Sequence, residues 1–258
     1  MTLSMSPERT SRPSRLLALA AAALILTPAS LLAQDSPTAR QIVDRHVEAS
    51  GGRSALDRAG ESMAEGTLTI PGAGITGRLV TRNAPNRMYM EFQVPGLGSI
   101  QSGFDGTTAW SSDPMQGPRI LTGPEREAIV DGTRAGASAR DTSAIQSMEA
   151  TGRDTVDGVE CWKVAVTWKS GRESTDCYSI ETGLLHATTA VNESAMGTQE
   201  VLVLMKEYKR FDEVLVPTRM ENHIGPQQMV MTIDSMQFGN VPADAFEPPP
   251  EIKALIGG

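Results

Sequence analysis

The sequence is poor in aromatic residues, cysteine and histidine, and each shortage excludes a class of protein. Among 258 residues there are five Phe, three Tyr, three Trp, two Cys and three His. His46, His186 and His223 are far apart, and none lies at a metal-binding spacing such as H-E-x-x-H. The G-x-S-x-G elbow of serine hydrolases is also missing. We therefore predict no metal site, no catalytic residue and no cofactor.

After residue 33 the chain has no apolar run long enough to cross a membrane. Before it, Arg9, Arg12 and Arg15 precede the stretch 16–26, which consists almost wholly of Leu, Ala and Ile. That stretch is too short for a membrane anchor, which is the alternative, and Ala33 suits a cleavage site. We predict a signal peptide at 1–33 and an exported, periplasmic protein that is not integral to the membrane.

Basic residues are outnumbered, 23 Lys and Arg against 31 Asp and Glu, which gives a net charge of −8. Loss of the predicted leader, which carries three arginines and one glutamate, makes the chain more acidic. This balance argues against nucleic acid and against an anionic membrane surface as partners. We see no repeat or linker in the remaining residues, so we predict one domain at 34–258 and a monomer.

The hydrophobic pattern predicts a mainly β protein. Helical spacing occurs at 38–50, with Thr38 as a plausible N-cap, and shorter helices are expected at about 53–59 and 123–132. Elsewhere the period is two, which indicates eleven or twelve strands in an antiparallel meander. They are expected at about 63–70, 75–82, 86–94, 98–104, 107–112, 145–152, 158–168, 172–180, 184–193, 198–210, 214–223 and 227–238. The Pro-rich tail is expected to follow the surface.

One face of this sheet is rich in methionine. The whole chain has thirteen methionines, and alternation places several of them with other apolar residues on one side. Methionine forms an adaptable lining for varied guests, although ordinary core filling explains the pattern equally well. The candidate ligand-binding residues on this face are Met88, Met90, Phe92, Met229, Met231 and Ile233, with Trp110 near a rim. The alternation does not tell which face is concave.

The two cysteines lie on neighbouring predicted strands. A three-residue loop at 169–171 would pair the apolar faces of these strands, so that Cys161 opposes Ser179 and Cys177 opposes Lys163. Both thiols then share a face, on a diagonal of about 7–8 Å that is slightly beyond disulfide reach. A bulge would close the gap. The sequence leaves open a Cys161–Cys177 disulfide and a pair of free thiols.

The stretch "GFDGTTAWSSDPMQGPRIL", residues 103–121, has the appearance of a catalytic motif. Asp105-Gly106, however, stands between two predicted strands, where a type I′ hairpin turn favours that dipeptide. Asp157-Gly158 is predicted to form a hairpin in the same way. The stretch is therefore interpreted as structural.

Several segments together resemble a known family. "IVDRHVEASGGRSAL", "GTLTIPGAGITGRLV", "APNRMYMEF" and "GFDGTTAWSSDPMQGP", followed by "VDGVECWKVAV" and "FDEVLVPTRM", are similar to exported outer-membrane lipoprotein-sorting-like proteins of the LolA/LolB-like carrier superfamily. The resemblance implies an unclosed, curved antiparallel β half-barrel whose N-terminal and short helices cover the concave face. It implies no catalytic residue, and the chain lacks the H-x-x-E-H of the zinc peptidases to which such sequences are sometimes attached.

We therefore predict a periplasmic, non-enzymatic carrier of an apolar ligand, namely lipid or lipoprotein acyl chains, with outer-membrane lipoprotein sorting as the expected context. A protein–protein interaction or sensor module with an envelope protein as partner is the first alternative. A hydrolase that uses one of the scattered histidines or aspartates is the second.

Overall fold

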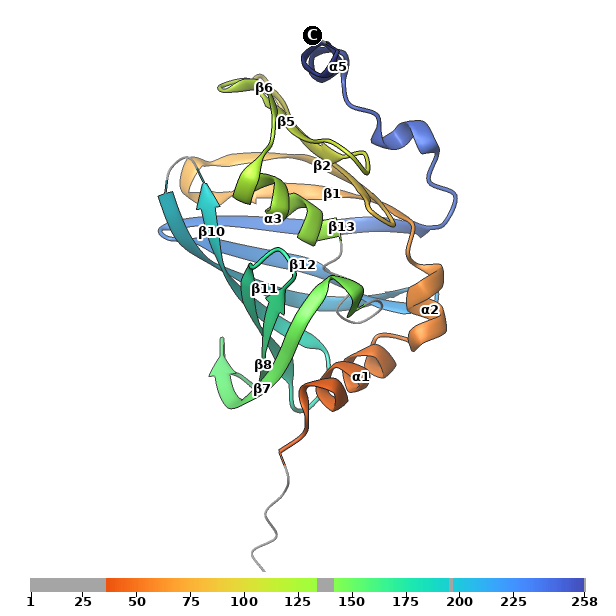
Figure 1. Ribbon diagram of the computed structural model, residues 1–258, viewed down its shortest axis with the longest axis vertical. Helices are drawn as coiled ribbons and strands as arrows, with labels where there is room; N and C mark the ends of the chain where they lie inside the picture. The colour runs from red at the N-terminus through yellow and green to blue at the C-terminus, as the bar shows by residue number, and fades with distance from the viewer. Residues whose placement is uncertain (1–35, 134–141, 195–196, 258) are drawn as a thin grey trace, which may run out of the picture. The chain divides into compact units, whose positions relative to one another are not determined.

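In the computed structural model, the described residues form a single antiparallel sheet of thirteen strands with a few helices (Figure 1). The structure describes residues 36–133, 142–194 and 197–257. The predicted leader, 1–33, lies outside them, and the domain division at residue 33 stays a prediction. No helix among the described residues is long and apolar enough to cross a membrane.

The strands follow one another along the chain in a meander. Their bounds are β1 Ser62–Ile70, β2 Ile75–Ala84, β3 Arg87–Val94, β4 Gly98–Phe104, β5 Ala109–Asp113, β6 Gly117–Ile120, β7 Ile145–Val156, β8 Val159–Trp168, β9 Glu173–Ser179, β10 Leu185–Ser194, β11 Gly197–Phe211, β12 Val214–Ile224 and β13 Gln227–Phe238. The order in the sheet is β6-β5-β4-β3-β2-β1-β13-β12-β11-β10-β9-β8-β7. Since β6 and β7 are both edge strands, the sheet is not closed into a barrel.

The helices are short. Their bounds are α1 Ala39–Ala49, α2 Arg53–Arg58, α3 Gly123–Thr133 and α5 Pro250–Ile256, with 3₁₀ turns at Pro71–Ala73, Thr142–Ala144 and Ala243–Phe246. The Thr38 side chain caps α1, and the Gln41 side chain bonds back to the Thr38 backbone. This capping box satisfies backbone N–H groups that the first turn would leave unpaired.

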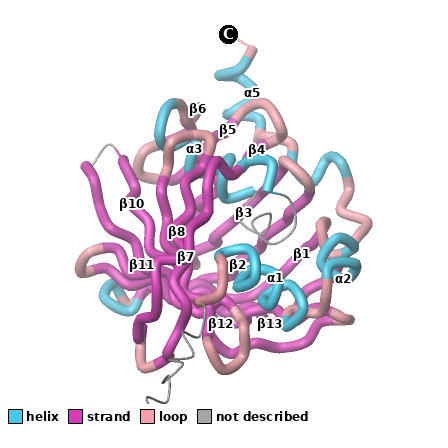
Figure 2. The backbone as a smooth tube through the Cα atoms, turned by 60° about the horizontal axis from the view of Figure 1, so that its bottom comes forward, coloured by secondary structure: helices cyan, strands magenta, loops and turns pink. Residues whose placement is uncertain are grey.

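One helix shows that the sheet is strongly curved. α3 contacts β4 and β5 near one edge and β10 near the other, although six strands separate β4 from β10 in the sheet. Eleven helical residues span only about 16 Å, whereas seven strand spacings of a flat sheet would cover about 33 Å. The sheet must therefore curl toward α3, and α3 lies on its concave face. The curl is visible in Figure 2.

Both faces of the sheet are partly covered. On the concave face, α1 packs its buried Ile42 and Val43 against Val164 and Val166 of β8. On the convex face, the C-terminal segment buries Phe246 and Ile252 against strands β3 and β5. The predicted half-barrel with helices on its concave face is confirmed, and the tail additionally covers part of the other face.

The predicted elements agree closely with the structure except for one strand and the C-terminal tail. The sequence reading missed β6, which is four residues long and contains Pro118, so that the alternation is too short to recognise. The tail was expected only to follow the surface, but it forms a 3₁₀ turn and α5, and Ile252 is fully buried. The structure thus has thirteen strands in place of eleven or twelve.

The two Asp-Gly turns differ from each other. Asp157 and Gly158 have φ of 46° and 79°, as a type I′ turn requires, so that prediction is confirmed. At Asp105-Gly106 the predicted hairpin is present, since β4 pairs with β5, but the two-residue type I′ form was wrong, because four residues separate the strands. There the Asp105 carboxylate accepts hydrogen bonds from the backbone N–H groups of Thr107 and Thr108, both at 2.8 Å. This side-chain turn closes the hairpin in place of a type I′ turn.

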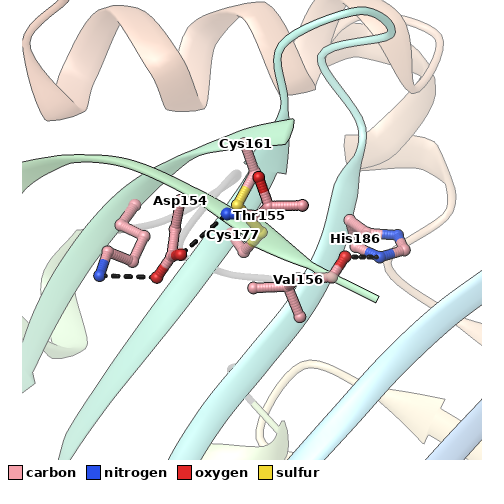
Figure 3. The surroundings of a disulfide bond; sticks show 7 residues. Asp154, Thr155, Val156, Cys161, Cys177 and His186 are labelled. Atoms are coloured by element: carbon pink, nitrogen blue, oxygen red, sulfur yellow. Dashed lines mark hydrogen bonds and ion pairs between the residues drawn. A yellow bond between two sulfur atoms is a disulfide. The ribbon is translucent and has the colours of Figure 1, made fainter. Parts of the chain in front are cut away.

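Cys161 and Cys177 form a disulfide between β8 and β9 (Figure 3). The predicted register is present, because Cys161 pairs with Ser179 and Lys163 pairs with Cys177. The predicted separation was too large, however, since the two Cα atoms are 5.4 Å apart. Strand twist brings one of the two diagonals of a strand pair closer than the other, which accounts for the difference.

We expect the disulfide to contribute about 3 kcal/mol to the free energy of unfolding, because it closes a loop of 16 residues in the unfolded chain. Denaturant titration with and without a reducing agent measures the contribution. The double variant Cys161→Ala/Cys177→Ala serves as the control and should be insensitive to the reducing agent. Equal stability of the wild type in both conditions would contradict the expectation.

Candidate functional site

The middle of the concave face is a row of methionines that crosses three strands and continues in a leucine on a fourth. Met231 of β13 pairs with Leu68 of β1 and Met220 of β12, and Met220 pairs with Met205 of β11. Directly paired residues in neighbouring strands point to the same side of a sheet. None of the three methionines is fully buried. This part of the concave face is therefore apolar, and its methionine side chains remain partly accessible.

The sequence-predicted lining residues fall into three groups. Phe92 and Ile233 are 3% and 4% exposed and belong to one core cluster, against which Met90, Met229 and Met231 pack as partly buried residues. These five share one face, as alternation predicted, and the structure shows that this face is the concave one. What the alternation missed is Met220, which completes the row and lies in the same cluster.

Met88 lies on the same face but in a different environment. It packs against Phe104, Ala109 and Leu121 beneath Val130 of α3. The helix covers this end of the concave face, so Met88 is separated from the open methionine row. Its predicted place on the face is correct, whereas its contact with a ligand stays a prediction.

Trp110 does not lie at a rim of this face. It is fully buried on the convex side, where it packs with Tyr89 beneath Phe246 and Ile252. Its indole lies directly over Gly103 of β4, so closely that a Cβ there would be 2.6 Å from the ring. Trp110 follows Ala109 in β5, and consecutive strand residues point to opposite faces. Because Ala109 faces α3, Trp110 points to the convex side. The tail that buries Trp110 comes more than 130 residues later, which the local pattern cannot reveal.

His46 joins α1 to the sheet at the other end of the concave face. Its Nδ1 accepts a hydrogen bond from the backbone N–H of Leu185 at 3.2 Å, and its ring lies 5.4 Å from that of Tyr178. Burial lowers the pKa of His46 to about 4, and a hydrogen bond with the Gly183 backbone opposes that shift. A protonated Nδ1 would direct an N–H at the N–H of Leu185. The helix is thus docked through a neutral imidazole.

The Ser50 hydroxyl lies 3.4 Å from the same Nδ1, which superficially resembles a nucleophile and its base. Ser50 is only 2% exposed and caps the end of α1. A nucleophile must reach a substrate carbonyl. This hydroxyl is enclosed, so the pair is structural.

A buried carboxyl group interrupts the apolar concave face. Asp176 of β9 is 7% exposed and accepts hydrogen bonds from the Thr188 hydroxyl at 2.8 Å and from the Tyr178 hydroxyl at 3.1 Å. Burial raises the pKa of Asp176, and the two hydroxyl groups oppose that shift. Burying a charged side chain on an apolar face lowers the stability of the protein unless the charge is paired. The sequence signal for this site is a polar residue within a predicted strand. Asp176 was not among the predicted site residues.

An ion pair joins α3 to the connection between β8 and β9. Asp131, 4% exposed, accepts from the Arg172 guanidinium at 3.0 Å and from the Ser170 hydroxyl at 2.8 Å. Beside this contact lies a cavity of about 560 Å³. It is lined by Gly123, Pro124, Glu127, Ala128, Ser170, Gly171, Arg172, Glu173 and Val191. The cavity borders the helix that spans the concave face.

The convex face of β11 and β12 carries a group of paired charges next to Leu204, which packs in the cluster around the disulfide. Glu221 is 9% exposed and pairs with Lys206 at 3.2 Å and Arg219 at 2.8 Å. These two cations lower its pKa against the opposing effect of burial. On the same face, His186 is hydrogen-bonded through Nε2 to the carbonyl of Val156 near the disulfide (Figure 3). Within the described residues, no three His, Cys, Asp or Glu side chains are placed to hold a metal ion.

Comparison with known proteins identifies the fold. The family model "Domain of unknown function (DUF4412)" matches residues 127–252. A LolA superfamily protein from Nitrosomonas europaea has a TM-score of 0.55 at 14% identity, over 83% of this chain and 99% of that chain. A DUF1329 family protein from Desulfovibrio piger has a TM-score of 0.48 at 13% identity, over 82% and 98% of the two chains. No curated protein matches the sequence. The chain has a LolA-like fold, on the strength of the first of these structures.

We expect His46 to make stability depend on pH. Between pH 6.5 and about 4 the unfolded chain takes up a proton that the native protein does not, so the free energy of unfolding should fall by roughly 3 kcal/mol across this window and then level off. Urea titrations of wild type and His46→Gln at several pH values measure it, and the variant should lack this part of the slope. His186→Gln is the control and should keep it. An unchanged slope in His46→Gln would contradict the assignment.

Arg172→Gln should lower the free energy of unfolding by about 1–3 kcal/mol, because it leaves the Asp131 carboxylate buried without a cation. A double-mutant cycle with Asp131→Asn isolates the pairwise contribution. The matched control is Arg40→Gln, which breaks the exposed Arg40–Asp44 pair and should cost less than about 0.5 kcal/mol. Equal effects of the two arginine substitutions would show that α3 is not held by this pair.

Proposed function

We propose that this protein is a periplasmic, non-enzymatic carrier that holds an apolar ligand on the concave face of its half-barrel. The ligand class is lipid or lipoprotein acyl chains, and the context is lipoprotein sorting to the outer membrane. The observation that supports it best is the partly accessible methionine row, formed by Met205, Met220 and Met231. Each buried methylene gains about 0.8 kcal/mol, so an apolar face binds an acyl chain without any catalytic group.

The LolA-like fold and the predicted export signal support the same proposal. The periplasm is where a protein with a cleaved signal peptide meets envelope lipids. A disulfide within the sheet also suits an oxidising compartment. The buried position of Ser50 and the structural role of His46 weigh against the hydrolase alternative.

A second candidate function, docking of an envelope protein, is favoured by one observation. Leu97 and Met115 are 62% and 95% exposed at the tips of the β3–β4 and β5–β6 hairpins. The two tips adjoin, because a Cβ on Gly98 would be 3.2 Å from the Pro114 ring. Adjacent exposed apolar side chains are a feature of protein interfaces.

Met90→Glu and Met231→Glu should each weaken uptake of a fluorescent fatty acid by more than about tenfold, because a carboxylate on the concave face opposes burial of an alkyl chain. Fluorescence titration measures the dissociation constant, and circular dichroism confirms that the variants are folded. Met231→Gln, which adds polarity without charge, provides a milder second variant.

The matched control is Met115→Glu, which introduces the same charge at a 95% exposed position outside the concave face. It should bind the fatty acid as the wild type does. Unchanged uptake by the two concave-face variants would contradict the assignment of this face. Native mass spectrometry of protein purified from the periplasm separates the two functions, because co-purified lipid supports the carrier and a consistently empty protein supports the docking module.

A further inference from the structure

A continuous cross-strand row on the concave face passes through Asp176. Its direct partners are Val164 on β8 and Thr188 on β10. Thr188 pairs with Val203 of β11, and Val203 pairs with Asn222 of β12. The row therefore runs from the carboxyl group of Asp176 toward the centre of the sheet.

The same row ends in the methionines. Asn222 pairs with Met229 of β13, two residues from Met231 on the same face. Four strand spacings of about 4.8 Å place Met229 at most roughly 19 Å from Asp176 along the sheet. An alkyl chain that lies over the methionine row can therefore bring its polar head to Asp176.

The carboxyl group of Asp176 has unused capacity to accept hydrogen bonds. A carboxylate offers about four acceptor positions, and the hydroxyl groups of Thr188 and Tyr178 occupy one on each oxygen. Among the described residues no Lys, Arg or His forms an ion pair with it. Burial raises its pKa, and these two hydroxyl groups oppose that shift.

We propose that Asp176 is a specificity-determining residue of the concave face and binds the primary ammonium head of an amphiphile whose alkyl chain lies on the methionine row. This inference rests on the proposed carrier function and adds the chemistry of the head group. The ammonium donates hydrogen bonds to the free acceptor positions of the carboxylate.

Charge explains why an ammonium fits better than other heads. Asp176 is buried without a paired cation, and this burial raises its pKa. The ligand-free protein therefore disfavours the ionised form of the side chain. A bound cation stabilises the ionised carboxylate, because a charge-assisted hydrogen bond is roughly twice as strong as a neutral one. An alkyl carboxylate would instead place a second negative charge beside the first.

The test compares dodecylammonium, dodecanol and dodecanoate as competitors of a fluorescent fatty-acid probe. In the wild type, dodecylammonium should displace the probe at about tenfold lower concentration than dodecanol. In Asp176→Asn, whose amide oxygen accepts from one of the two hydroxyls and whose amide nitrogen can donate to the other, this preference should disappear. Asp234→Asn, which removes an exposed carboxylate on β13, is the control and should keep the preference.

The outcomes separate the two proposals. If none of the three dodecyl compounds displaces the probe, the carrier function itself is overturned. If all three compete equally, or if Asp176→Asn retains the preference for the ammonium, the head-group assignment is overturned and the carrier function stands. A purely structural Asp176 would alter stability in the variant without altering this selectivity.

A second test uses the wild type alone, so its result does not depend on whether Asp176→Asn folds. Dodecyltrimethylammonium carries the same charge as dodecylammonium but has no N–H group to donate. It should compete at least about fivefold more weakly if the carboxylate binds through hydrogen bonds. Equal competition by the two cations would overturn the assignment without any variant.

Discussion

The curvature of the open sheet depends on the anchoring of α3 at both ends of the strand order. Val130 packs into the cluster of Phe104, Ala109 and Leu121 near one edge, while the next residue, Asp131, is paired with Arg172 near the other. An antiparallel sheet with two free edges has no hydrogen bonds that hold it in a closed shape. The helix supplies this connection with one apolar and one charged contact. The concave face exists as a sheltered surface because these contacts keep the two ends of the sheet near each other.

The two faces then differ in chemistry, although they belong to the same strands. In β11 and β12 the concave side presents Met205 and Met220, and the convex side presents Lys206 and Glu221. Strand alternation brings about this separation residue by residue. The ionic network belongs to the outer surface, whereas the carboxyl group of Asp176 is embedded in the inner one. Asp176 is therefore held by two hydroxyl groups, whereas Glu221 is paired with two cations.

The sequence predicted the elements well because they depend on local backbone periodicity. Period-two alternation placed nearly every strand, and the same alternation assigned Met90, Met229 and Met231 to one side. It failed where the deciding contact is distant. Trp110 was placed at a rim, but the C-terminal tail covers it, and the diagonal between Cys161 and Cys177 was judged too long because twist is a property of the assembled sheet.

By itself, the sequence determined which residues share a face, where the chain turns, and that two thiols lie on adjacent strands. These properties follow from dihedral preferences within a few residues. Only the tertiary structure decided which face is concave, that α3 spans it, and that Asp176 is buried there with two hydroxyl partners. Burial and curvature arise from contacts between segments that are far apart in the chain, and no local pattern encodes them. The resemblance to lipoprotein carriers predicted the shape correctly, and the charge within the apolar face became visible only in the folded chain.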